Sequence, residues 1–204
     1  MKEFKYKSLT TDMWLEHLWA FWNKHNPEVA EKLKREVDFN AWLFGEGTAL
    51  PVKMQFDTTL ADAAYALAEQ WNTARDSSKP SFSPADIEGF KSTQVELFLD
   101  ILEGYEAFTP EMVEELNKQY KLEESNNAEI KVRWYAVALK AGQYAPEAAR
   151  WVTTVGRMKF ARPTYRAINK VDPALAKKTY KEQGRKFLHP IARKVVAKDL
   201  GVPY

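Results

Sequence analysis

Two cations, Arg157 and Lys159, have the spacing and the setting of a carboxylate-binding pair. Gly156 comes just before them and favours the end of a helix, whereas Pro163 favours the start of a new one, so we expect a loop from Gly156 to Phe160. Residues two apart share a side in an extended segment but diverge on a helix. An Arg fork and a Lys point charge on one side could then grip a carboxylate, each bond contributing about 1.5–3 kcal/mol. The alternative is a structural role, in which both cations interact with the exposed backbone carbonyls at the end of a helix.

The three histidines, His17, His25 and His189, do not have the spacing of a metal-binding helix, which places two histidines four residues apart with a glutamate after the first. We expect packing or surface roles for His17 and His25. Because Pro190 follows His189 directly, we expect that histidine to cap a helix rather than to transfer protons. The chain therefore offers no zinc site and no catalytic residue that we can name.

Other residue types that could do chemistry are better explained by structure. Neighbouring carboxylates such as Glu114 and Glu115 diverge on a helix, so we expect them to lie on a solvated surface. Trp71 and Trp134 lie on apolar helical stripes and are expected in the core. Trp14, Trp19 and Trp22 crowd one short helix, and part of that face is a candidate surface for a missing domain.

The elements that must position Arg157 and Lys159 are expected to be helices. Prolines recur where a first helical turn tolerates them, at Pro27, Pro84, Pro110, Pro146, Pro173 and Pro190. Apolar stripes predict further helical faces, at Leu60, Ala64, Leu67, Ala68 and Trp71, at Val95, Phe98, Leu99 and Leu102, and at Ile130, Trp134, Val137 and Ala141. Capping boxes are predicted from Ser83 to Asp86 and from Thr93 to Glu96, helix ends at Gly104 and Gly142, and long loops at Gly45 to Gln55 and Asp76 to Pro80. The pattern predicts an all-α fold without a sheet.

Composition bounds the class of protein. There are no cysteines, which excludes disulfides and sulfur nucleophiles and is compatible with a cytoplasmic location. No apolar stretch approaches the length of a membrane span, so we expect no membrane partner.

The two halves of the chain have opposite charges. Up to Ile130 the chain has 13 Lys or Arg against 24 Asp or Glu, and from Lys131 onward it has 17 against 4. The basic half either steers anionic ligands or neutralises the acidic half within the fold. Its cations follow no nucleic-acid-reading motif, so nucleic acid is not an expected partner.

Several runs together resemble the carboxy-terminal helical domain of leukotriene A4 hydrolase and related zinc aminopeptidases. The runs are FKYKSLTTD, NAWL, FDTTLADAAYALAEQW, NNAEIKVRW, GRMKFARP and HPIARKVVAKDL, in that order from Phe4 to Leu200. The resemblance implies a right-handed α-α superhelix, similar to armadillo or HEAT stacks, as one domain over residues 1–204, with residues 1–12 a leader from the end of a preceding catalytic domain. Met1 would then begin an excised fragment.

The resemblance also implies a function. Arg157 and Lys159 would face the active-site cleft, where Arg157 holds the carboxylate of a peptide or of a fatty-acid-derived epoxide and Lys159 assists. The parent enzyme would carry zinc in its catalytic domain and remove amino-terminal residues from peptides, with epoxide hydrolysis left open. Its catalytic and amino-terminal domains would be the partners of this chain, which we expect to be inactive alone. The alternative is a helical-repeat interaction scaffold without an enzymatic role.

Overall fold

The computed structural model describes residues 3–76 and 81–203, whose regular secondary structure is helical, with no strand among them. They form two compact units, which meet in the sequence at Phe56 and Asp57. No described helix is long and apolar enough to cross a membrane. The all-α prediction is confirmed, whereas the prediction of one domain with a leader at residues 1–12 stays a prediction.

The described part of the first unit, residues 3–56, contains three helices and a long loop. The helices are α1 (Thr11–His25), α2 (Pro27–Glu36) and α3 (Phe39–Phe44). The rings of Trp14 and Trp19 pack on Phe39, with centroids 6.3 and 5.3 Å away, yet Ala30 is the only buried apolar residue in the described part of this unit. A loop follows from Gly45 to Gln55, as predicted. Trp14, Phe21, Trp42 and Phe44 of this unit are each at least 40% exposed.

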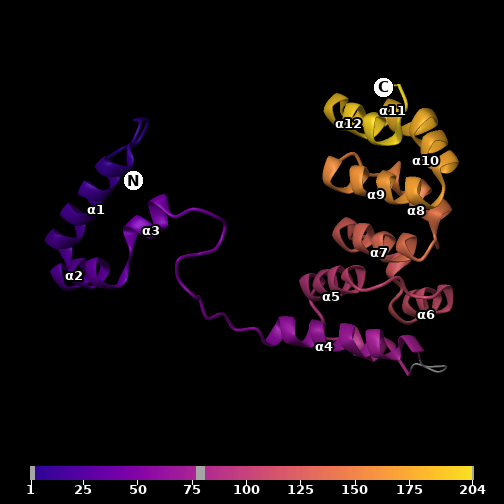
Figure 1. The fold of residues 1–204 in the computed structure, drawn as a ribbon, viewed down its shortest axis with the longest axis horizontal. Helices are drawn as coiled ribbons and strands as arrows, with labels where there is room; N and C mark the ends of the chain where they lie inside the picture. Colours follow the sequence, from indigo (N-terminus) through magenta and orange to yellow (C-terminus); the bar gives the residue numbers. More distant parts are fainter. Residues whose placement is uncertain (1–2, 77–80, 204) are drawn as a thin grey trace. The chain divides into compact units, whose positions relative to one another are not determined.

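The second unit is a stack of helices that contact one another in sequence order, as Figure 1 shows for α4, α5, α7, α9 and α12. Its α-helices are α4 (Thr59–Thr73), α5 (Ser92–Gly104), α6 (Pro110–Tyr120), α7 (Ala128–Lys140), α8 (Ala145–Val152), α9 (Met158–Val171), α10 (Pro173–Thr179), α11 (Arg185–Phe187) and α12 (Pro190–Leu200). Short turns join them, namely η1 (Ala74–Asp76), η2 (Pro84–Ile87), η3 (Leu122–Glu124) and the π-helical turn η4 (Tyr180–Gly184). Residues 77–80 of the predicted loop from Asp76 to Pro80 lie outside the described part of the chain.

One continuous core runs through this stack. Trp71 and Trp134 are fully buried, as predicted, and so are Tyr165 and Tyr180. The predicted stripes face the core, with Ile130 and Ala141 partly buried against it. The exception is Leu60, whose side chain is 50% exposed although its carbonyl accepts from the Gln94 side chain of α5 at 3.0 Å.

The predicted helix starts are mostly confirmed. Pro27, Pro84, Pro110, Pro146, Pro173 and Pro190 all lie in first turns. Asp86 accepts a hydrogen bond from the Ser83 N–H and completes the first predicted capping box. The predicted box from Thr93 to Glu96 is wrong, because α5 begins at Ser92 and Gln94 accepts from the Lys91 N–H instead. A shift of two residues moves the cap while the buried stripe stays the same.

The predicted helix start at Pro163 is wrong, since α9 begins at Met158 and carries Pro163 inside it. A proline at this position removes one N–H from the helical ladder, the one that would bond to the carbonyl of Lys159. That loss falls near the helix start, and burial of Phe160, Tyr165 and Ile168 along one face of α9 supports the helix on both sides of the proline. Packing therefore outweighs a local helix-breaking signal.

Candidate functional site: the start of helix α9

Arg157 lies at the junction where the chain leaves α8 and enters α9. Helix α8 ends at Val152, and Thr153 and Thr154 turn back so that their hydroxyls donate to the carbonyls of Arg150 and Trp151, each across 2.7 Å. The backbone of Arg157 is extended, with φ −72° and ψ 125°, and its carbonyl accepts from the N–H of Ala161 at 3.0 Å. Arg157 is thus the N-cap residue of α9.

The predicted loop from Gly156 to Phe160 is therefore correct only up to Arg157, because Lys159 lies in the first turn of the helix. Arg157 and Lys159 therefore do not lie on one side of an extended loop, contrary to the prediction. Both charges nevertheless lie near one ring, since the guanidinium carbon of Arg157 is 6.0 Å and the Lys159 ammonium 5.0 Å from the Phe160 ring centroid. Phe160 is buried, so the position of its ring is fixed by the surrounding core.

The Arg157 side chain is exposed and makes no ion pair or hydrogen bond with a described residue. It lies beside the amino terminus of a 14-residue helix, where the unpaired backbone N–H groups and the helix dipole also favour negative charge. An exposed guanidinium at such a helix start can bind a carboxylate from solvent through its two-pronged fork.

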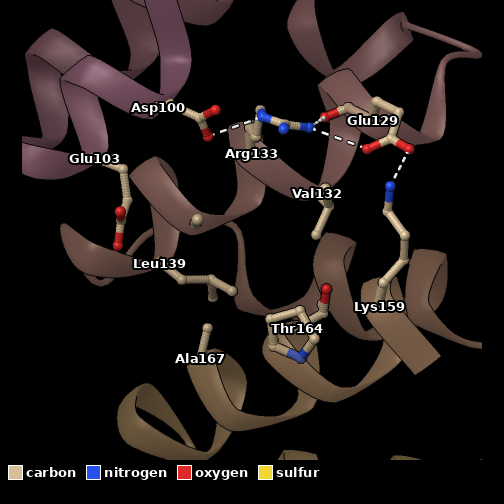
Figure 2. A pocket seen from close by; sticks show the side chains of 11 residues that line it. Asp100, Glu103, Glu129, Val132, Arg133, Leu139, Lys159, Thr164 and Ala167 are labelled. Atoms are coloured by element: carbon tan, nitrogen blue, oxygen red, sulfur yellow. Dashed lines mark hydrogen bonds and ion pairs between the residues drawn. The ribbon is translucent and has the colours of Figure 1, made fainter. Parts of the chain in front are cut away.

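Lys159 is in a different situation, because its ammonium forms an ion pair with Glu129 in the first turn of α7 (Figure 2). Hydrogen bonding from Lys159, followed by that from Arg133, holds the pKa of the Glu129 carboxyl below its usual value. Glu129 is therefore ionised at neutral pH, and part of the Lys159 charge is compensated before any ligand arrives.

A network of ion pairs extends from Glu129 to α5 through Arg133. The Arg133 guanidinium donates to Asp100 at 2.8 Å and to the second Glu129 oxygen at 3.2 Å, and lies 3.5 Å from Glu96. It also donates to the Glu129 carbonyl at 2.8 Å. Burial lowers the pKa of Arg133, but the bonds to Asp100 and Glu129 outweigh it and raise the pKa overall. Acidic residues of α5 and α7 thus form ion pairs with basic residues of α7 and α9. This agrees with the alternative in which the basic half of the chain, from Lys131 onward, neutralises the acidic half within the fold.

A pocket of about 250 Å³ lies beneath this network, between α5, α7 and α9. Figure 2 shows the charged side chains of Asp100, Arg133, Glu129 and Lys159 along one side of it. Its apolar lining is Val132, Ala136, Leu139, Pro163 and Ala167. Arg157 does not line the pocket. The structure therefore separates the two predicted site residues into a cation at the helix start that is unpaired with any described residue and a paired cation at the pocket rim.

The predicted roles of two histidines are confirmed. His17 packs edge-on against the Phe4 ring at 5.0 Å and lies 3.1 Å from Glu3. His189 accepts from the Ile191 N–H at 3.3 Å and so caps α12. Within residues 3–76 and 81–203, no group of three or more His, Asp or Glu side chains could hold a metal ion, so this part of the chain does not fit a zinc site.

Sequence reasoning missed Glu129, Arg133 and Asp100 as neighbours of Lys159. Thirty residues separate Glu129 from Lys159, and no local spacing signals a contact between different helices. The periodicity that places Trp134 in the core does put Arg133 and Glu129 on one helix face, four residues apart, which is the single signal available.

Comparisons with known proteins agree on one family. A family model described as leukotriene A4 hydrolase, C-terminal, matches residues 90–200. Leucine aminopeptidase 2 of Yarrowia lipolytica is 43% identical over 98% of this chain and 31% of its own length, and that of Aspergillus oryzae is 39% identical over 97% and 32%. The structure of native yeast leukotriene A4 hydrolase matches with a TM-score of 0.83 and 32% identity over 96% of this chain and 33% of that one. The chain thus spans about a third of the length of these relatives, and it belongs to the family of leukotriene A4 hydrolase carboxy-terminal domains.

Proposed function

We propose that this chain is the carboxy-terminal part of a larger aminopeptidase, in which it forms one wall of the substrate cleft and binds the substrate's carboxylate through Arg157. The observation that carries this proposal is the exposed Arg157 guanidinium, unpaired with any described residue at the start of α9. The relatives named leucine aminopeptidase 2, which are about three times as long, support both the activity and the missing portion.

Arg157 would position the substrate rather than break a bond. A guanidinium that holds the far end of a peptide sets the register of the scissile bond against the catalytic groups, so its loss lowers turnover as well as affinity. The zinc that the family implies would be bound by residues outside this chain, because the described residues supply no ligand set for it. We therefore assign no step of the reaction to a metal held here.

The rest of the enzyme would contact the first unit. Trp14 and Phe21 on α1 are 40 and 43% exposed, and Trp42 and Phe44 on α3 are 46 and 72% exposed. Aromatic surface of this size on so small a unit suits burial against the preceding domains. The stack from α4 to α12 would extend as a right-handed superhelix, and the protein would act in the cytoplasm on peptides, with fatty-acid epoxides as a further substrate class.

The test compares the full-length protein with its Arg157→Ala variant on one tripeptide, offered as the free acid and as the carboxy-terminal amide. We expect the variant to lose the preference for the free acid. Arg166→Ala is the matched control, because Arg166 is an exposed cation on the same helix. A preference that survives in Arg157→Ala as strongly as in the control contradicts the proposal. A helical-repeat interaction scaffold without an enzymatic role would instead restore no peptidase activity when this chain is combined with the remaining portion of the enzyme.

A further inference from the structure

We propose that the ion pair with Glu129 weakens the attraction of Lys159 for the substrate's carboxylate, and so reduces the preference of the enzyme for a free-acid substrate. This inference rests on the proposed function of Arg157. Its starting point is the ion pair that joins Glu129 on α7 to Lys159 on α9 (Figure 2).

The Glu129 carboxylate competes with the substrate for the Lys159 ammonium, and its position is fixed by hydrogen bonds to both of its oxygens. One carboxylate oxygen accepts from Lys159, and the other accepts from Arg133 at 3.2 Å. Arg133 in turn is fixed by its bond to Asp100 at 2.8 Å and by the Glu129 carbonyl at 2.8 Å. An acid tail that approaches Lys159 therefore has to share the ammonium with a carboxylate that is held in place from two sides.

The net negative charge around Lys159 also repels the carboxylate of a substrate. The network contains the carboxylates of Glu96, Asp100 and Glu129, but only the cations Arg133 and Lys159. Glu103 adds a further carboxylate to the lining of the pocket below. The negative excess favours Arg157, which is outside the network, as the place where an acid tail binds.

Removal of the Glu129 charge should break the ion pair with Lys159 and leave the Lys159 ammonium without a compensating carboxylate. In Glu129→Gln the cluster loses its negative excess, and the freed ammonium becomes a second ligand for the acid tail. We expect the ratio of kcat/KM for the free-acid tripeptide to that for its amide to rise by about threefold or more, which is the size of one exposed charge pair. Arg133 keeps its bonds to Asp100 and Glu96, so the contact between α5 and α7 remains.

The decisive experiment is a double-mutant cycle in the full-length enzyme with Glu129→Gln, Lys159→Met and both together. Lys159→Met alone should change the ratio by less than about twofold, because its charge is already compensated. In the Glu129→Gln background the same change should remove the entire gain. The ratio of two substrates cancels any general loss of folded enzyme, so a structural defect alone does not produce this pattern.

Glu147→Gln is the matched control, because Glu147 pairs with Arg150 at 2.7 Å and its side chain is 28% exposed, against 29% for Glu129. An unchanged or lower ratio in Glu129→Gln, or a gain that survives Lys159→Met, overturns the inference. If Glu129→Gln does not fold, a change of more than about twofold in Lys159→Met alone overturns it too. Arg157→Ala separates the two proposals, since loss of the preference in that variant keeps the proposed function even where the Glu129 arm fails.

Discussion

The indole N–H of Trp71 donates a hydrogen bond to the hydroxyl of Tyr120 across 3.0 Å inside the core. The same hydroxyl donates to Asp86 at 2.9 Å, and Asp86 also accepts from the N–H of Ser83 at 2.8 Å. One phenol thus connects α4, α6 and the turn η2, and satisfies the polar atom of a tryptophan that is fully buried.

Tyr120→Phe should destabilise the fold by about 1–3 kcal/mol, because the Trp71 N–H is left buried without a partner. Urea unfolding followed by tryptophan fluorescence measures the loss. Tyr65→Phe serves as the control, since the Tyr65 side chain is 53% exposed. Equal stability of the two variants would show that the bond to Trp71 contributes nothing.

Gly184→Ala should also destabilise the chain, because a Cβ at this position of η4 would clash with the Tyr165 hydroxyl and lie 3.2 Å from a ring carbon of Tyr180. Both tyrosines are fully buried and cannot move aside, so we expect a loss of about 1–3 kcal/mol. Thermal unfolding followed by circular dichroism is the measurement. Gly104→Ala is the comparison, because nothing lies within 4 Å of a Cβ there. A melting temperature unchanged in Gly184→Ala would contradict the packing around η4.

Asp199→Asn should reveal a pH-dependent contribution from the bond between α9 and α12. Arg162 donates to the two Asp199 oxygens at 2.7 and 3.2 Å, and this bonding lowers the pKa of the carboxyl below its usual value. Since the folded pKa lies below the unfolded one of about 3.9, the pair stabilises the fold above about pH 4, and the contribution is lost as pH falls from there through the folded pKa.

The expected loss in Asp199→Asn at pH 7 is about 0.5–1 kcal/mol, because the Arg162 side chain is 43% exposed and solvent screens the pair. Urea unfolding at pH 7 and at pH 3 measures it, with the difference between variant and parent shrinking at the lower pH. Glu88→Gln controls for removal of an exposed carboxylate. A difference that grows at pH 3 would contradict the assignment.

The sequence predicts the helices and their caps because those signals are local. Asn26, Thr109 and Asp172 precede prolines, and the side chain of each accepts a hydrogen bond from the backbone N–H three residues further on, which caps the following helix. Pro163 shows where local reasoning fails, since burial along the whole of α9 outweighs one missing N–H. The site divides in the same way. Arg157 is marked by its neighbours in the chain, whereas the partner of Lys159 is set by how α7 packs on α9.

Binding of the substrate's carboxylate by Arg157 is tested most directly by the ratio of kcat/KM for a free-acid tripeptide to that for its amide, measured in full-length Arg157→Ala. A lost charge-assisted bond of about 1.5–3 kcal/mol predicts that the ratio falls by roughly 10- to 150-fold relative to the parent enzyme. A ratio equal to that of the parent would contradict such binding.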